Sequence, residues 1–141
     1  MKNLKILTVL LISLISIGSC SKEEDFVQDL DVKLEEAFEL KIDELATIPE
    51  RSLSIKVKDV LEDSRCPELA MCTWAGQIKL EFEITANQVT STREIIYQEG
   101  KELILEFGDY IYSIIQVTPD NQIDEVIELS DYTFTLFIEK K

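Results

Sequence analysis

The sequence contains no histidine, and carboxylates and cysteines are the candidate reactive groups that stand out in it. Without histidine, the usual general base, the Ser-His and Cys-His nucleophile pairs and most catalytic zinc sites are excluded. The 28 acidic residues would allow a carboxylate pair such as a glycosidase uses, but no spacing singles out one pair. A glycine-rich phosphate loop is also missing. The sequence therefore predicts no catalytic residue and no cofactor, and we do not expect an enzyme.

Oxygen-bearing side chains follow Pro119 and offer ligands of the kind that calcium takes. They are Asp120, Asn121, Gln122, Asp124 and Glu125. Their spacing lacks the central glycine and the terminal glutamate of an EF-hand loop. A solvated turn is the favoured interpretation, and no metal site is predicted.

The amino-terminal residues 1–19 have the pattern of an export signal. Lys2 and Lys5 precede a mostly apolar run from Ile6 to Ile17. A membrane-spanning helix needs roughly 20 apolar residues, so this shorter run fits the core of a cleaved signal better than a permanent span. Residues 1–19 are therefore expected to be removed.

The residues at the expected cleavage point resemble the lipobox of bacterial lipoproteins: Ile17, Gly18, Ser19 and Cys20. The resemblance implies diacylglycerol on the Cys20 sulfur, cleavage before Cys20 and an acyl chain on the new amino terminus. Each buried methylene contributes about 0.8 kcal/mol, and two or more chains hold a protein firmly on a membrane. The expected membrane contact is therefore lipid on Cys20. The alternative is an ordinary signal that happens to end at a cysteine.

The residues after Cys20 resemble the surface-export signal of lipoproteins in Bacteroidetes, because Lys22 is followed by Glu23, Glu24 and Asp25. That resemblance implies an outer-membrane lipoprotein carried to the cell surface. The alternative is a solvated linker, which runs of charge without apolar partners usually form. Removing residues 1–19 takes away two of 14 basic residues and none of 28 acidic ones, so the charge becomes 12 − 28 = −16. Such a charge argues against nucleic acid as a partner.

Two cysteines remain once Cys20 carries lipid, and both lie in one short segment. In an exported protein, an even pair as close as Cys66 and Cys72 predicts a disulfide. A thioredoxin-type redox site has two residues between its cysteines, and a zinc site usually has four ligands. The pair matches neither pattern, so a structural disulfide is favoured.

The segment around the two cysteines is similar to a motif of small exported bacterial β-proteins of uncharacterised function. The motif residues are Arg65-Cys66-Pro67, followed by Cys72, Trp74 and Gly76. The resemblance supports the fold and the exported compartment, and it implies no activity. Trp74 is expected to pack against the disulfide or the sheet, and the alternative is an exposed anchor for a partner. Arg65 is expected to form an ion pair with Asp63, and the alternative is a ligand clamp.

The elements that must position this loop are β-strands, because apolar and polar residues alternate in short runs. The clear runs are Leu53–Val57, Ile78–Ile84, Leu103–Phe107 and Tyr132–Ile138, and weaker ones are Phe38–Ile42, Thr92–Tyr97 and Tyr110–Val117. Gly108 and Asp109 predict a hairpin turn. About seven strands without a helix for a βαβ crossover predict an antiparallel sandwich or barrel. We favour an all-β sandwich with an immunoglobulin-like look.

The chain is expected to contain one folded domain, residues 32–141, after a lipidated acidic tether of residues 20–31. Within Asp25–Ala37, apolar residues repeat every four positions, so a short amphipathic helix is the alternative to a mobile segment.

The favoured function is a lipid-anchored, non-catalytic surface module that binds an envelope protein or a glycan. A second hypothesis is a protease inhibitor whose disulfide loop enters the protease cleft, since a rigid loop loses little entropy on binding. A carboxylate-only glycosidase is the third. The oligomeric state is not predicted.

Overall fold

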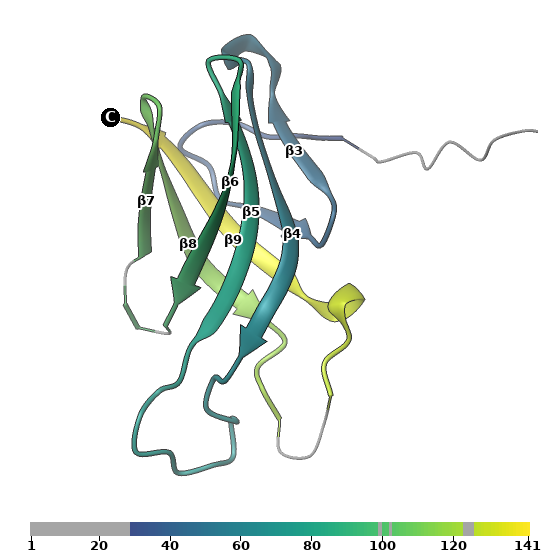
Figure 1. The fold of residues 1–141 in the computed structure, drawn as a ribbon, viewed down its shortest axis with the longest axis vertical. Helices are drawn as coiled ribbons and strands as arrows, with labels where there is room; N and C mark the ends of the chain where they lie inside the picture. The colour runs from purple at the N-terminus through teal and green to yellow at the C-terminus, as the bar shows by residue number, and fades with distance from the viewer. Residues whose placement is uncertain (1–28, 99, 102, 123–125) are drawn as a thin grey trace, which may run out of the picture.

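The structure is a computed structural model that describes residues 29–98, 100, 101, 103–122 and 126–141. Over these residues the chain forms nine strands and two short 3-10 helices (Figure 1). The strands are β1 (Leu30–Asp31), β2 (Phe38–Lys41), β3 (Leu45–Ile48), β4 (Leu53–Asp63), β5 (Ile78–Ala86), β6 (Val89–Tyr97), β7 (Leu103–Phe107), β8 (Tyr110–Thr118) and β9 (Thr133–Lys140); the 3-10 helices are η1 (Pro49–Arg51) and η2 (Leu129–Asp131). The expectations for the signal peptide, Cys20 and Lys22 fall outside the described residues.

The strands form two facing sheets, and the prediction of an all-β antiparallel sandwich is confirmed. One sheet has the order β1-β3-β4-β5-β6, and the other has the order β2-β9-β8-β7. Every named pair is antiparallel except β1 with β3. Most neighbours are consecutive in sequence, so each sheet is mainly a meander. The likeness to immunoglobulin domains therefore lies in the two-layer architecture, since those domains use Greek-key connections.

The core between the sheets follows from the alternation along the long strands. In β5, each second residue is buried, from Ile78 to Ala86, while the residues between them are partly exposed. β9 alternates in the same way, with Phe134, Leu136 and Ile138 buried. Each such side chain contributes about 1.5 to 3 kcal/mol when it leaves water. Sheet-to-sheet burial of these side chains is therefore the main source of stability.

All seven predicted strands are present, and the structure adds β1 and β3. β3 was missed because it has only four residues, of which Ala46 and Ile48 are buried. The assignment of Leu30 and Asp31 to the tether is wrong, because both residues pair in parallel with β3. Residues 29–37 contain no helix, so the amphipathic-helix alternative does not hold for that part of the segment. Among the described residues, no helix is long and apolar enough to cross a membrane.

The two ends of the sandwich differ in their connections. Figure 1 shows the loop 64–77 and the described parts of the β8–β9 connection, 119–122 and 126–132, at one end, while the tight β5–β6 and β7–β8 turns lie at the other. The described chain starts at the turn end, where Asp29 lines a shallow hollow with Thr85 and Gln88. β4 connects the two ends with 11 residues, which span about 35 Å. The cysteine loop therefore lies far from the point where the chain enters the domain.

Candidate functional site

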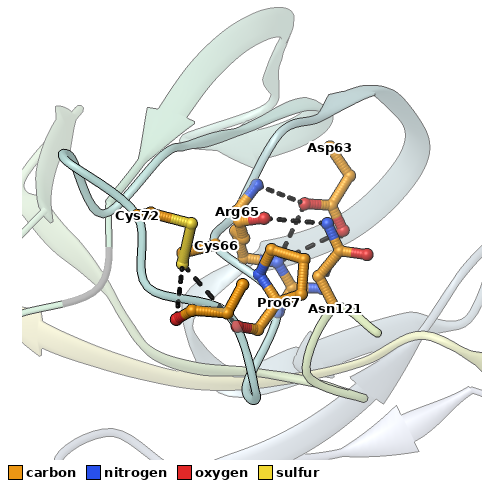
Figure 2. Close-up of a disulfide and its surroundings, with 7 residues drawn as sticks. Asp63, Arg65, Cys66, Pro67, Cys72 and Asn121 are labelled. Carbon is orange, nitrogen blue, oxygen red and sulfur yellow. Dashed lines mark hydrogen bonds and ion pairs between the residues drawn. A yellow bond between two sulfur atoms is a disulfide. The ribbon is translucent and has the colours of Figure 1, made fainter. Parts of the chain in front are cut away.

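The first part of the candidate site is the disulfide loop between β4 and β5. Cys66 and Cys72 form a disulfide with their Cα atoms 6.0 Å apart, and the prediction of this bond is confirmed (Figure 2). Closing a loop of this length stabilises the fold by roughly 2 to 2.5 kcal/mol on the chain-entropy estimate. Because of this bond, the loop stays compact without a hydrophobic core of its own.

Backbone contacts hold the base of the loop together. Ser64 N–H donates to the Gln77 carbonyl at 2.8 Å, and Cys66 N–H donates to the Ala75 carbonyl at 3.0 Å. Gly76 lies beside this ladder with φ +71°, and a Cβ there would lie 1.9 Å from the Ser64 carbonyl oxygen. Only glycine fits both the positive φ and the close approach. The glycine of the sequence motif is therefore a requirement of the loop backbone.

The Arg65 side chain is buried at this end of the molecule, with only 6% of its surface exposed. Its Nε lies 3.0 and 3.2 Å from the two Asp63 carboxylate oxygens, and its Nη2 lies 2.7 Å from one of them. Figure 2 shows the two side chains facing each other at the base of the loop. Arg65 thus forms the expected loop-bracing ion pair. Arg65 also lines a hollow between the cysteine loop and β8.

Arg65 also donates hydrogen bonds to backbone carbonyls at the end of β8 that β7 does not reach. β7 pairs with β8 only as far as Ile114, and β8 continues beyond it. In that extension the Ile115 carbonyl accepts from the Tyr97 hydroxyl at 3.2 Å. Arg65 Nη1 donates to the Val117 carbonyl at 2.9 Å, and Nη2 donates to the Pro119 carbonyl at 2.8 Å. Side chains from the end of β6 and from the loop after β4 therefore satisfy carbonyls that β7 does not reach.

The pKa values of Asp63 and Tyr132 depend on the contacts of these residues with each other and with Arg65. Burial alone would raise the pKa of the Asp63 carboxyl, but hydrogen bonds from Arg65 and its positive charge outweigh burial and hold the pKa below its usual range. The Tyr132 hydroxyl donates to Asp63 at 2.9 Å. Burial and this bond to a carboxylate raise the pKa of Tyr132 to about 12. Asp63 is thus ionised and Tyr132 neutral at physiological pH.

The Pro119 loop is attached to the cysteine loop through Asn121. Asn121 Nδ2 donates to the Arg65 carbonyl at 2.8 Å, and Glu68 N–H donates to the Asn121 carbonyl at 3.0 Å. Sequence reasoning missed this role and treated Asn121 as part of a solvated turn. Of the other calcium candidates, Asp120 and Gln122 are exposed, and Asp124 and Glu125 lie outside the described residues. Among the residues that are described, no group of three or more acidic or cysteine side chains is arranged to hold a metal ion.

The cysteine loop exposes three large apolar side chains. Leu69, Met71 and Trp74 are 86%, 103% and 76% exposed, and we call these three side chains the apolar tip. The expectation that Trp74 packs into the core is wrong. The close approach of Gly76 to Ser64 pins the backbone at the base of the loop, and residues 71–75 all lie at the surface. Trp74 is therefore exposed, as the alternative interpretation of an exposed anchor requires.

Two hollows in the surface are lined by residues of the cysteine loop. The first, of about 440 Å³, is lined by Trp74 together with Gln77, Gln98 and Lys101. The second, of about 560 Å³, separates the loop from β8 and has Glu68 on its lining. The residues that line the two hollows do not pair a nucleophile with a base.

In comparisons with known proteins, no family model, no curated protein and no solved structure matches the chain. The site is therefore defined by its own geometry: a disulfide loop, braced from beneath by a buried arginine, that exposes an apolar tip.

Proposed function

We propose that the protein is a non-catalytic, lipid-anchored binding module that contacts a partner protein through the apolar tip. The exposure of Leu69, Met71 and Trp74 on a braced loop is the observation that carries the proposal. Leaving such side chains in water forgoes about 1.5 to 3 kcal/mol each, which the fold could have gained by burying them. Tryptophan and methionine are enriched in protein interfaces, and tryptophan in particular dominates their binding energy.

The composition of the tip favours a protein over a glycan. Tyr97, Tyr110 and Tyr112 are buried in the core, so they do not extend Trp74 into an aromatic platform. The nearest exposed large side chains in the sequence are aliphatic or thioether groups. Apolar side chains of this kind match the uncharged centre of a protein interface.

The bracing beneath the tip supports binding for a second reason. The loop is held by the disulfide, by the Arg65–Asp63 pair and by Asn121, so few of its backbone torsions are left to be ordered by a partner. A contact surface that is already ordered loses less entropy on association. The buried cluster therefore serves the exposed tip by fixing its position.

The direction of the tip supports an outward-facing role. With Cys20 in the membrane, residues 20–28 reach at most about 30 Å before the described chain begins. That point lies at the turn end of the sandwich, and the apolar tip lies at the opposite end. The proposal therefore places the partner on the side of the domain away from its own membrane.

The protease-inhibitor hypothesis also uses this loop but is less favoured. Ala70 N–H donates to the Pro67 carbonyl at 2.9 Å, which closes a turn across Glu68 and Leu69. A protease cleft takes up an extended segment, and the turn holds these residues in a curve. A panel of proteases that is unaffected by the purified chain would remove this hypothesis.

The binding proposal is tested by capture from cell-envelope extract. We expect the purified chain and the variant Val89→Ser to retain the same protein, and the triple variant Leu69→Ser, Met71→Ser, Trp74→Ser to lose it. Val89 is a matched control because it is 59% exposed but lies at the turn end of the sandwich. All changed residues are exposed, so folding should be unaffected. Equal capture by all three proteins, or by none, contradicts the proposal.

The anchor is tested separately by growing expressing cells with a clickable fatty acid. We expect the label on the wild-type chain and on Cys66→Ser/Cys72→Ser, and no label on Cys20→Ser. Label that survives Cys20→Ser would show that another residue carries the lipid, or that the attachment is of another kind.

A further inference from the structure

β6 is the last strand of its sheet. In the order β1-β3-β4-β5-β6 it pairs with β5, and no other described strand lies beyond it. The pairing with β5 runs from Val89 to Tyr97 without a register shift, and β6 contains no proline. Bulges and prolines are two of the features that keep edge strands from pairing with other chains. β6 therefore has the length and regularity of a strand that is able to join two copies of the protein.

Arg93 is a charged residue on the inner side of this edge strand. It lies opposite Phe82 of β5, whose side chain is buried between the sheets. Directly opposed residues of an antiparallel pair lie on the same face of the sheet, so Arg93 starts from the core side of β6. Ile95, two positions further along the strand, is buried on this side, whereas Arg93 is exposed. The Arg93 side chain therefore reaches from the core side of the strand into solvent.

The Arg93 guanidinium spans the open side of the sandwich. Its central carbon lies 5.8 Å from the centre of the Phe107 ring in β7, which is an edge strand of the other sheet. A cation within about 6 Å of a ring centre is attracted to the ring face. Phe107 is only partly buried. The contact therefore covers part of an apolar side chain and holds a positive charge beside β6.

We infer that Arg93 prevents a second copy of the chain from pairing with β6. A strand added to β6 would send its inner side chains into the space beside Arg93 and remove water from the guanidinium. Burial of a charge without an opposite partner is strongly unfavourable. An inward-pointing charge on an edge strand is a known protection against such pairing. The inference is independent of the proposed binding function, because it concerns another surface.

Two-fold pairing of β6 would also bring like charges together. Facing residues share a face, so in an antiparallel pair that keeps most of β6 paired, Arg93 of one copy lies opposite Ser91, Arg93 or Ile95 of the other. The two guanidinium groups are then opposite or diagonal neighbours. Like charges placed in this way destabilise strand pairing. Both burial and repulsion therefore depend on the charge of Arg93.

Sedimentation velocity of the purified full-length chain tests the inference through Arg93→Val and Arg93→Gln, which remove the charge. We expect both variants to form dimers with a dissociation constant at least about tenfold lower than that of wild type or of Arg93→Lys, which keeps the charge. Thr92→Val is the matched control. Thr92 lies opposite the partly exposed Glu83 on the outer face, so this change makes the edge more apolar while Arg93 remains. It should behave like wild type.

Amide hydrogen exchange identifies the surface that pairs. In Arg93→Val, raising the protein concentration should slow exchange in β6 and leave the edge strand β7 unchanged. Urea unfolding checks that each variant is folded. Folded neutral variants that associate no more than wild type would overturn the inference. Equal association of Arg93→Lys or Thr92→Val, association that leaves exchange in β6 unchanged, or a wild-type chain that already pairs through β6 would overturn it as well.

Discussion

Replacing Arg65 with methionine should destabilise the domain more than any surface change, because Arg65 supports two loops at once. The substitution removes the ion pair with Asp63, whose side chain is 10% exposed against 6% for Arg65. Breaking such a buried pair from one side costs about 3 to 5 kcal/mol, because the remaining charge has no partner. The Val117 and Pro119 carbonyls also lose their donor. These losses overlap, so we expect a total of about 3 to 5 kcal/mol.

Equilibrium unfolding in urea at neutral pH measures this loss. The midpoint should fall while the slope stays the same, since the surface exposed on unfolding is unchanged. Arg65→Lys keeps the charge but not the planar fork of donors, so it should lose roughly half as much. Arg51→Met is the matched control, because Arg51 is exposed in η1 and its loss should stay within about 0.5 kcal/mol.

A double mutant separates the charge from the packing. Adding Asp63→Asn to Arg65→Met removes the uncompensated carboxylate, so the double variant should be more stable than Arg65→Met alone. The reasoning is refuted if Arg65→Met loses no more stability than Arg51→Met. A double variant less stable than Arg65→Met would refute the role assigned to the unpaired charge.

Three further outcomes concern stability. Gly76→Ala should cost more than about 2 kcal/mol in urea unfolding, because its Cβ would meet the Ser64 carbonyl, and a loss below about 0.5 kcal/mol would contradict the loop geometry. Tyr112→Phe should raise stability by about 1 kcal/mol, because the buried Tyr112 hydroxyl has no hydrogen-bond partner among the described residues, and a clear loss would show that the hydroxyl is satisfied. The folded-state pKa of Asp63 is below its unfolded value of about 3.9, so its contribution is complete above that pH and is lost as the pH falls through the folded pKa. Asp63→Asn should therefore lose stability relative to wild type at neutral pH and much less at about pH 2, and an equal difference at both would contradict the assignment.

Sequence reasoning succeeded where structure depends on local alternation. The period-two pattern of β5 and β9 specifies strands because each inward residue meets the facing sheet. β3 and β1 were missed because four and two residues are too few to show a period. The parallel pairing of β1 depends on where β3 lies in the folded chain, and no local signal marks it.

The candidate site was predictable in its covalent part and not in its long-range contacts. The disulfide and the Arg65–Asp63 pair follow from residues close in sequence. Asn121 reaches Arg65 across 56 positions, a contact that no spacing rule indicates. Trp74 was misjudged because burial of a large aromatic residue is the usual outcome. Here the inner place beside the loop is taken by Arg65 and by Tyr132, whose ring lies 6.0 Å from the guanidinium carbon.

Photo-crosslinking on intact cells tests the central claim most directly. A photoreactive amino acid replaces Met71 in the apolar tip in one strain and Val89, at the opposite end, in another. The account predicts that irradiation links the chain to a discrete partner protein from position 71 and not from position 89. The same adduct from both positions, or an adduct from position 89 alone, would contradict the claim that the protein binds through its cysteine loop.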